Sequence, residues 1–248
     1  MKNFFLLLGN KYINIKSPLE IYDFLQTLKG VKEFLFESNI GNFLTKANLS
    51  LYRDNTKAEY LAYIKMDGMK RDLRAYDIED IFGKAIEMLV AFFGDFLYLH
   101  ASGVKISEKK GWIFIGPSGH GKSTVVKTFP KRDILADDRI IIKDEKTLFK
   151  IFAVPCVGSK IVLSPGGVVL DKMFFIYPEF SSKSKLRKMK PVEAFLELCK
   201  NSIWYVSKKD VKKKIIFMHK LVNLVPCYKL QFSLCDLYLL KKWKKKNG

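Results

Sequence analysis

Residues 116–124 read Gly-Pro-Ser-Gly-His-Gly-Lys-Ser-Thr, and this stretch decides how the rest of the chain is interpreted. Its spacing, G-x-x-x-x-G-K-S-T, is typical of a phosphate-binding loop. Glycines let the backbone turn tightly and bring its N–H groups close to phosphate oxygens. The lysine reaches the β- and γ-phosphates, and the next serine supplies a hydroxyl for Mg²⁺. The motif predicts a nucleoside triphosphate site formed by Gly116, Pro117, Ser118, Gly119, His120, Gly121, Lys122, Ser123 and Thr124.

The sequence on either side of the loop has the order that the motif requires. Residues 111–115 predict a short apolar strand, and residues 125–128 can continue a helix. The N-terminus of that helix would direct unpaired donors and a partial positive charge at the same anion. Strand, glycine-rich turn and helix together predict a nucleotide site, but they fit a kinase, an ATPase and a switch equally well.

The composition is that of a folded globular protein, because 48% of the 248 residues are apolar and 28% are charged. The four cysteines are scattered, without a Cys-x-x-Cys pair. This pattern argues against a zinc knuckle or a disulfide framework and fits a reducing cytoplasm. No stretch is long and apolar enough to span a bilayer. We therefore expect a cytoplasmic protein with no membrane partner.

The positive charge is concentrated near the C-terminus. The formal net charge is +19, and residues 182–248 contribute 18 Lys and Arg against 4 Asp and Glu, or +14. Such a surface can attract nucleic acid, anionic lipid or acidic protein, or it can be a solvated lysine-rich face. Lysine, the less discriminating reader of phosphate, dominates over arginine. An acidic protein or peptide partner is therefore favoured over nucleic acid.

The chain divides into two predicted regions. Residues 1–75 predict a small N-terminal α/β domain, and residues 76–248 predict a larger domain that contains the loop. Residues 77–93 are apolar on one face and predict a long helix that packs on a sheet. Residues 96–106 predict two strands separated by a kink at small residues. Because a hairpin-like pair then precedes the loop, we expect a mixed sheet and not a purely parallel one.

Two aspartates, Asp137 and Asp138, follow the predicted strand 134–136, shortly after the loop and its helix. A carboxylate at a strand end beside a phosphate loop can hold Mg²⁺, and another can accept the proton of an attacking hydroxyl. Strand neighbours point to opposite faces, so the two aspartates could divide these roles. The alternative is a solvated turn ahead of the β-hairpin predicted over residues 139–154.

Two histidines lie near the loop in the sequence. His100, on the strand before the loop, could orient an acceptor or bind phosphate, although a single histidine on a strand is more often a satisfied core residue. His120 occupies a variable position of the motif, where we expect its backbone to matter more than its ring.

Residues 99–104, 116–124 and 135–139 together resemble the catalytic domain of HPr kinase/phosphorylase and its shorter relatives. The order, spacing and residue types match, and the aspartate pair also resembles the nucleotide site of ATP-dependent phosphoenolpyruvate carboxykinase, a much longer enzyme of the same fold. The resemblance is sharp over residues 96–142 and weaker to about residue 235. Residues 1–75 resemble the short leader domain of stand-alone HPr-kinase-like proteins, some of which act in peptide-modification pathways.

This resemblance implies a fold, a set of roles and an assembly. The fold would be α/β, with an HPr kinase/phosphoenolpyruvate carboxykinase-like mixed sheet that contains the P-loop, and a small N-terminal α/β domain. Lys122 would bind phosphate, Ser123 and Asp138 would serve Mg²⁺, Asp137 would be the general base, and His100 would match the family's active-site histidine. The family also implies a homo-oligomer. The chain has no clear counterpart of the family's Glu-containing segment or phosphorolysis loop, so the reverse reaction is not implied.

The predicted function is that of an ATP-dependent, Mg²⁺-dependent kinase that transfers the γ-phosphoryl group to a serine hydroxyl of a small protein or peptide. Two alternatives remain at this point: a small-molecule kinase and a non-catalytic regulator that binds ATP as a signal. The motif reads phosphates and not the base, so GTP and pyrophosphate also remain as donors.

Overall fold

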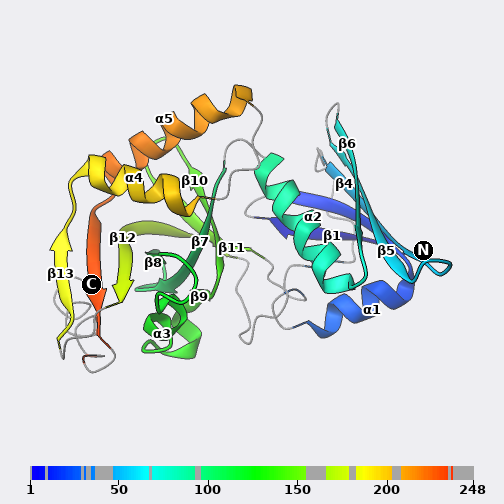
Figure 1. The fold of residues 1–248 in the computed structure, drawn as a ribbon, viewed down its shortest axis with the longest axis horizontal. Coiled ribbons are helices and arrows are strands. Elements are labelled where there is room, and N and C mark those ends of the chain that lie inside the picture. Colours follow the sequence, from blue (N-terminus) through cyan, green and yellow to red (C-terminus); the bar gives the residue numbers. More distant parts are fainter. Residues whose placement is uncertain are drawn as a thin grey trace. The chain divides into compact units, whose positions relative to one another are not determined.

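The computed structural model describes residues 2–8, 11–28, 31, 35–36, 47–66, 69–92, 96–154, 166–178, 183–202, 208–233 and 236. The chain forms two compact α/β units (Figure 1). Unit 1 contains Met1–Phe92 together with Val154–Pro165, and unit 2 contains Phe93–Ala153 and Gly166–Gly248. Within the described residues, no helix combines the length and the apolar character needed to cross a bilayer.

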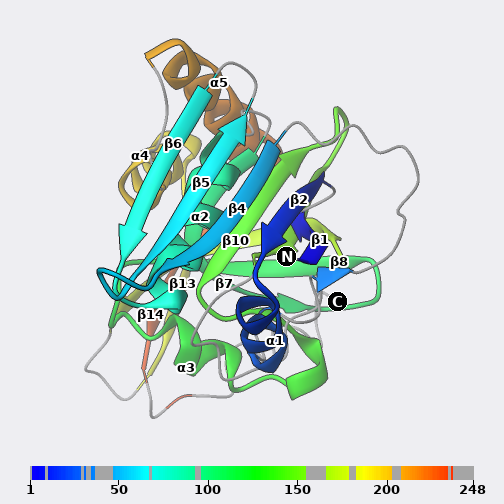
Figure 2. The same cartoon turned by 90° about the vertical axis from the view of Figure 1, so that its right-hand side faces the viewer.

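Unit 1 contains a six-stranded mixed sheet. Its elements are β1 (Lys2–Leu8), β2 (Lys11–Ser17), α1 (Leu19–Thr27), β3 (Leu35–Phe36), β4 (Ala47–Asp54), β5 (Glu59–Met66), β6 (Met69–Ala75) and α2 (Ile78–Phe92). The strand order is β3-β1-β2-β4-β5-β6. β2 and β4 are parallel, and the other neighbours are antiparallel. Figure 2 shows β4, β5 and β6 as three long strands side by side.

Helix α2 belongs to unit 1, and this differs from the predicted boundary at residue 75. The carboxylate of Asp77 caps the helix by accepting the N–H groups of residues 79 and 80, at 2.5 and 3.2 Å. The buried face of α2 packs against β5 and β6, and its fully buried side chains are Ile81, Phe82, Ala85, Ile86, Leu89 and Val90. The apolar face found in the sequence is therefore used by the N-terminal sheet, and the N-terminal segment of unit 1 ends at Phe92.

Unit 2 contains an eight-stranded mixed sheet. Its elements are β7 (Phe96–Lys105), β8 (Lys110–Ile115), α3 (Lys122–Val126), a 3₁₀ turn (Lys131–Asp133), β9 (Ile134–Ala136), β10 (Arg139–Asp144), β11 (Phe149–Ala153), β12 (Val168–Pro178), β13 (Lys185–Lys188), α4 (Pro191–Asn201), α5 (Lys208–Leu224) and β14 (Cys227–Phe232). The order is β11-β10-β7-β8-β12-β14-β13, with β9 on β7. β8, β12 and β14 are parallel, and the remaining pairs are antiparallel. The predicted mixed α/β sheet is confirmed.

Strand β7 is continuous where the sequence predicts two strands and a kink. Its small residues serve close packing: a Cβ added at Gly103 would lie 2.8 Å from Cδ1 of Ile140 on β10. The pairing with β9 shifts register between Gly103 and Val104. The small side chains therefore let β9 and β10 approach one continuous strand.

One end of the unit 2 sheet closes on itself. β11 pairs with β12 as well as with β10, so five strands form a ring in the order β11-β10-β7-β8-β12. Gly111 on β8 packs tightly in this ring, because an added Cβ would lie 2.7 Å from Val168 Cγ2, 2.9 Å from Ile151 Cδ1 and 3.0 Å from the carbonyl oxygen of Val104. Only glycine leaves room for the neighbouring strands here.

Aromatic side chains fix the segment after α3 on the sheet. The rings of Phe114 and Phe174, on the paired strands β8 and β12, are stacked with centroids 5.2 Å apart. Phe129 meets the edge of Trp112 at 6.5 Å and also approaches Phe114 at 6.2 Å. Such contacts add to the apolar area that these rings bury, so the chain on both sides of the loop is held rigidly.

We expect Gly111→Ala to lower the free energy of unfolding by about 1–3 kcal/mol, because the new methyl group meets a backbone carbonyl that cannot rotate away. The matched control is Gly83→Ala in α2, where an added Cβ meets nothing within 4 Å. That change should stabilise by about 0.5–1 kcal/mol. Urea unfolding measures both, and equal effects of the two substitutions would contradict the packing described for the ring.

Candidate functional site

The predicted phosphate-binding loop connects β8 to α3, as the motif requires. Gly119 and Gly121 have φ angles of 81° and 92°, in the left-handed region where glycine is unstrained. Gly121 is also the N-cap of α3. Pro117, Ser118 and Gly119 are exposed, so the outer part of the loop is open to a ligand.

His120 anchors the loop to β12. Its Nδ1 lies 3.2 Å from the carbonyl oxygen of Ile176, and because a carbonyl can only accept, Nδ1 carries the proton. The same carbonyl oxygen would lie 3.1 Å from a Cβ added at Gly116, so loop and strand approach closely. The sequence predicted no role for the His120 ring, because its contact with Ile176 joins residues far apart in the chain and has no local signal.

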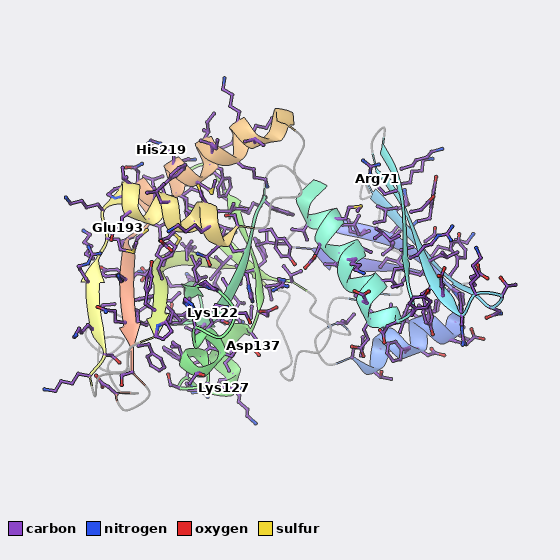
Figure 3. All side chains as sticks on the ribbon, in the orientation of Figure 1. Arg71, Lys122, Lys127, Asp137, Glu193 and His219 are labelled. Atoms are coloured by element: carbon purple, nitrogen blue, oxygen red, sulfur yellow. The ribbon has the colours of Figure 1, made fainter. Side chains whose placement is uncertain are left out.

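Lys122 is nearly fully buried, with 5% of its surface exposed. Its ammonium group donates to the carbonyl oxygens of Gly116 and Pro117, at 2.8 and 3.0 Å. Burial lowers the pKa of Lys122, the charge of Asp138 opposes this, and Arg139 and Asp137 exert smaller effects in opposite directions. Figure 3 shows Lys122 and Asp137 in the same part of unit 2. The site therefore holds a buried cation that an anion would stabilise.

Asp137 and Asp138 lie where β7 changes partner from β9 to β10. Ala136 on β9 pairs with Gly103, and Arg139 on β10 pairs with His100, all on the same edge of β7. Between these pairs, Ala101 N–H donates to the carbonyl oxygen of Asp138 at 3.1 Å, and the buried hydroxyl of Ser102 donates to that of Asp137. The backbone of the aspartate pair is thus fixed by β7.

The carboxylate of Asp138 is held from two sides. One oxygen is hydrogen-bonded to Nε2 of His100 and the other accepts from the guanidinium of Arg139. Burial alone would raise the pKa of Asp138, but the hydrogen bond from His100 and the charge of Arg139 outweigh burial and lower it. The structure thus brings together His100 and Asp138, which are both predicted site residues. It also adds Arg139, which directly follows Asp138 but which the sequence did not single out.

Asp137 differs from its neighbour. Its Oδ1 atom is buried and has no hydrogen-bond partner among the described residues. A buried acceptor without a partner costs about 1–3 kcal/mol, and more when it is charged. Such an atom at the edge of a phosphate loop fits a group that arrives with the ligand, such as a hydroxyl, a water or a metal ion.

The donors available for Mg²⁺ are few. Ser123 is half-buried in the first turn of α3, and Thr124 beside it is exposed. In the part of the chain that the structure describes, no group of three or more His, Cys, Asp and Glu side chains is placed to hold a metal. Mg²⁺ usually takes one or two carboxylates and completes its shell with water and substrate phosphates. The Ser123 hydroxyl and one carboxylate of the Asp137–Asp138 pair fit that kind of partial site.

Comparison with known proteins yields structural similarity only. No family model matches the chain. No curated protein matches it. Among solved structures, 31 chains match. One of them is the HPr(Ser) kinase/phosphatase from Coxiella burnetii, which is 13% identical to this chain and has a TM-score of 0.34. The match covers 60% of this chain and 94% of that chain. Function is therefore inferred from the residues of the site.

We expect Mg-ATP to raise the melting temperature of the wild-type protein. A ligand present at about 100 times its Kd stabilises by about 2.7 kcal/mol, which corresponds to several degrees for a chain of this size. Lys122→Met should lose most of this shift, because the buried charge that faces the phosphates is gone. Lys127→Met removes an exposed lysine at the end of the same helix and should keep it. An undiminished shift in Lys122→Met would show that nucleotide binds elsewhere.

Proposed function

We propose that the protein is a Mg²⁺-dependent kinase that transfers the γ-phosphoryl group of ATP to a serine hydroxyl on a small protein or peptide. The observation that carries this proposal is that a buried cationic group and a buried acceptor oxygen lie at one site. The buried ammonium of Lys122 needs an anion, and the buried Oδ1 of Asp137 needs a proton donor or a cation. A phosphate donor and a hydroxyl acceptor would satisfy both.

The loop residues would bind and orient the donor. Glycines 119 and 121 give the backbone its left-handed turns, and His120 holds the loop to β12. Lys122 already lies beneath the loop, so its charge is fixed before the nucleotide arrives. Preorganised charge of this kind costs no reorganisation during the reaction. Mg²⁺, bound through Ser123 and the aspartate pair, would neutralise charge on the phosphates.

The aspartate pair would act on the acceptor. We assign the general base to Asp137, because its Oδ1 is free to accept the proton of a hydroxyl. Asp138 is engaged by His100 and Arg139. Its carboxylate retains lone pairs for a metal-bound water, so its proposed place is beside Mg²⁺. His100 would act by holding Asp138 in position.

The protein nature of the acceptor is supported by charge. The C-terminal part of the chain carries most of the net positive charge of +19, which would attract an acidic substrate. A small-molecule kinase gains no support from the described residues, since the β10–β11 hairpin follows the aspartates where such kinases continue with helices and an arginine-rich lid.

The decisive assay is incubation with γ-labelled ATP and cell extract, followed by mass spectrometry of the labelled species. We expect a labelled serine, and we expect Asp137→Asn to reduce the rate by about 10²–10⁴-fold, as for other general bases, while Mg-ATP binding is retained. Asp133→Asn, in the 3₁₀ turn before β9, is the matched control and should stay active.

Two outcomes would contradict the proposal. If the wild-type protein binds Mg-ATP but labels no hydroxyl, the protein is a nucleotide-dependent regulator. If Asp137→Asn labels serine at the wild-type rate, the proton is accepted elsewhere.

A further inference from the structure

A concave surface lies on unit 2, between α4 and α5. It is a groove of about 350 Å³, on the side of the sheet opposite α3 in both ribbon views (Figures 1 and 2). Figure 3 likewise shows His219 on the α5 side and Lys122 on the α3 side. The groove is therefore separate from the phosphate loop.

The lining of the groove is apolar. It is formed mainly by Pro191, Val192, Phe195, Ile215, Ile216 and Val222. Two of these side chains are costly to leave in water, because 73% of Val192 and 58% of Ile216 are exposed. Leu196, on the next turn of α4 after Val192, is also exposed and extends the same apolar surface.

The spacing of the lining residues is that of two facing helix surfaces. On α5 they recur one turn apart, from Ile215 and Ile216 through His219 to Val222 and Asn223, and on α4 they occupy the first turn. A groove between two helices fits a third helix that places apolar side chains one turn apart into it. The polar groups of the lining include Asn223, whose amide donates to the carbonyl oxygen of His219 at 2.7 Å.

Exposed positive charge flanks the groove at both ends. Lys212 is exposed one turn before Ile216 on α5, and Lys190 is exposed immediately before α4. The acidic residues of α4 are already paired: Glu193 binds Arg187, and Glu197 binds Lys200 at 2.8 Å. Among the described residues, the groove therefore presents apolar surface beside exposed lysines, and charge complementarity favours an acidic partner.

From this surface we propose that the α4–α5 groove binds an amphipathic helix of a partner protein or peptide, with apolar anchors between acidic residues. A second copy of this chain is disfavoured as the occupant, because each copy carries a net charge of +19 and would bring the same lysines together. The interaction needs neither nucleotide nor phosphotransfer, so it stands apart from the activity proposed above.

The test is fluorescence anisotropy with two designed helical peptides of about 18 residues, long enough to form a helix on binding. Both carry leucines at i, i+3, i+4 and i+7; one has glutamates and the other lysines at the flanking positions. Without nucleotide, the full-length protein should bind the glutamate peptide at least about ten-fold more tightly than the lysine peptide. This preference should shrink as salt is raised.

Variants of the full-length protein locate the site. Ile216→Ser and Lys212→Glu should each weaken binding of the glutamate peptide by about ten-fold or more. The matched control for Ile216→Ser is Leu224→Ser, an equally exposed residue of α5, 58% in each case, that does not line the groove. Lys70→Glu, exposed in unit 1, controls for charge. Val192→Ser provides an independent test on α4 should Ile216→Ser lose its helical circular dichroism.

Three outcomes would overturn the proposal. The first is that the two peptides bind equally or not at all. The second is that Val192→Ser and Ile216→Ser bind the glutamate peptide as tightly as Leu224→Ser does. The third is that light scattering shows a wild-type dimer that Val192→Ser converts to monomer, in which case the groove is an interface between copies of this chain.

Discussion

Strand β7 is the constraint on which the candidate site depends. On one edge it pairs with β8, whose end enters the phosphate-binding loop, and on the other it pairs with β9 and then β10. The two aspartates lie at the change of partner, and residues 101 and 102 of β7 hold their carbonyl groups. One strand thus sets the position of the loop and of the two aspartates together, and catalytic groups need such a fixed mutual geometry.

The electrostatics of the site are unbalanced in a way that favours a ligand. Lys122 is buried against carbonyl oxygens, and burial lowers its pKa. Asp137 has a buried oxygen without a partner among the described residues. Asp138, by contrast, is paired with His100 and Arg139, and its pKa is lowered. A buried charge and a buried acceptor without a partner both reduce stability, and sites that bind charged ligands commonly retain such groups. Asp138, which is held by His100 and Arg139, thus lies at a fixed position beside Asp137.

The parts of the fold that the sequence predicted are those with local signals. The strand before the loop, the glycine turns of the loop and strand 134–136 lie within one short stretch, and the roles of the loop residues and of the aspartates stay predictions. What could not be predicted depends on contacts between distant segments. The apolar face of α2 could have covered either sheet. The bonds from His120 to Ile176 and from His100 to Asp138 depend on strand register, which no local pattern specifies. Helix α5 lies in the lysine-rich region, for which charge alone left a solvated face and an acidic partner open. Its groove with α4 depends on the packing of two helices and has no local signal.

The central claim is that Lys122 binds the phosphate to be transferred while Asp137 accepts the proton of the hydroxyl that attacks it. A crystal structure of the wild-type protein with Mg²⁺ and a non-hydrolysable ATP analogue tests it most directly. We predict that the triphosphate lies in the loop at 116–124, with its γ-phosphate at hydrogen-bond distance from Nζ of Lys122. We also predict that Oδ1 of Asp137 borders the space beside the γ-phosphate that the acceptor hydroxyl would occupy, with a water molecule in place of that hydroxyl. A nucleotide bound outside the loop, or an Asp137 carboxylate turned away from the phosphate into a bond with the protein, would contradict the account.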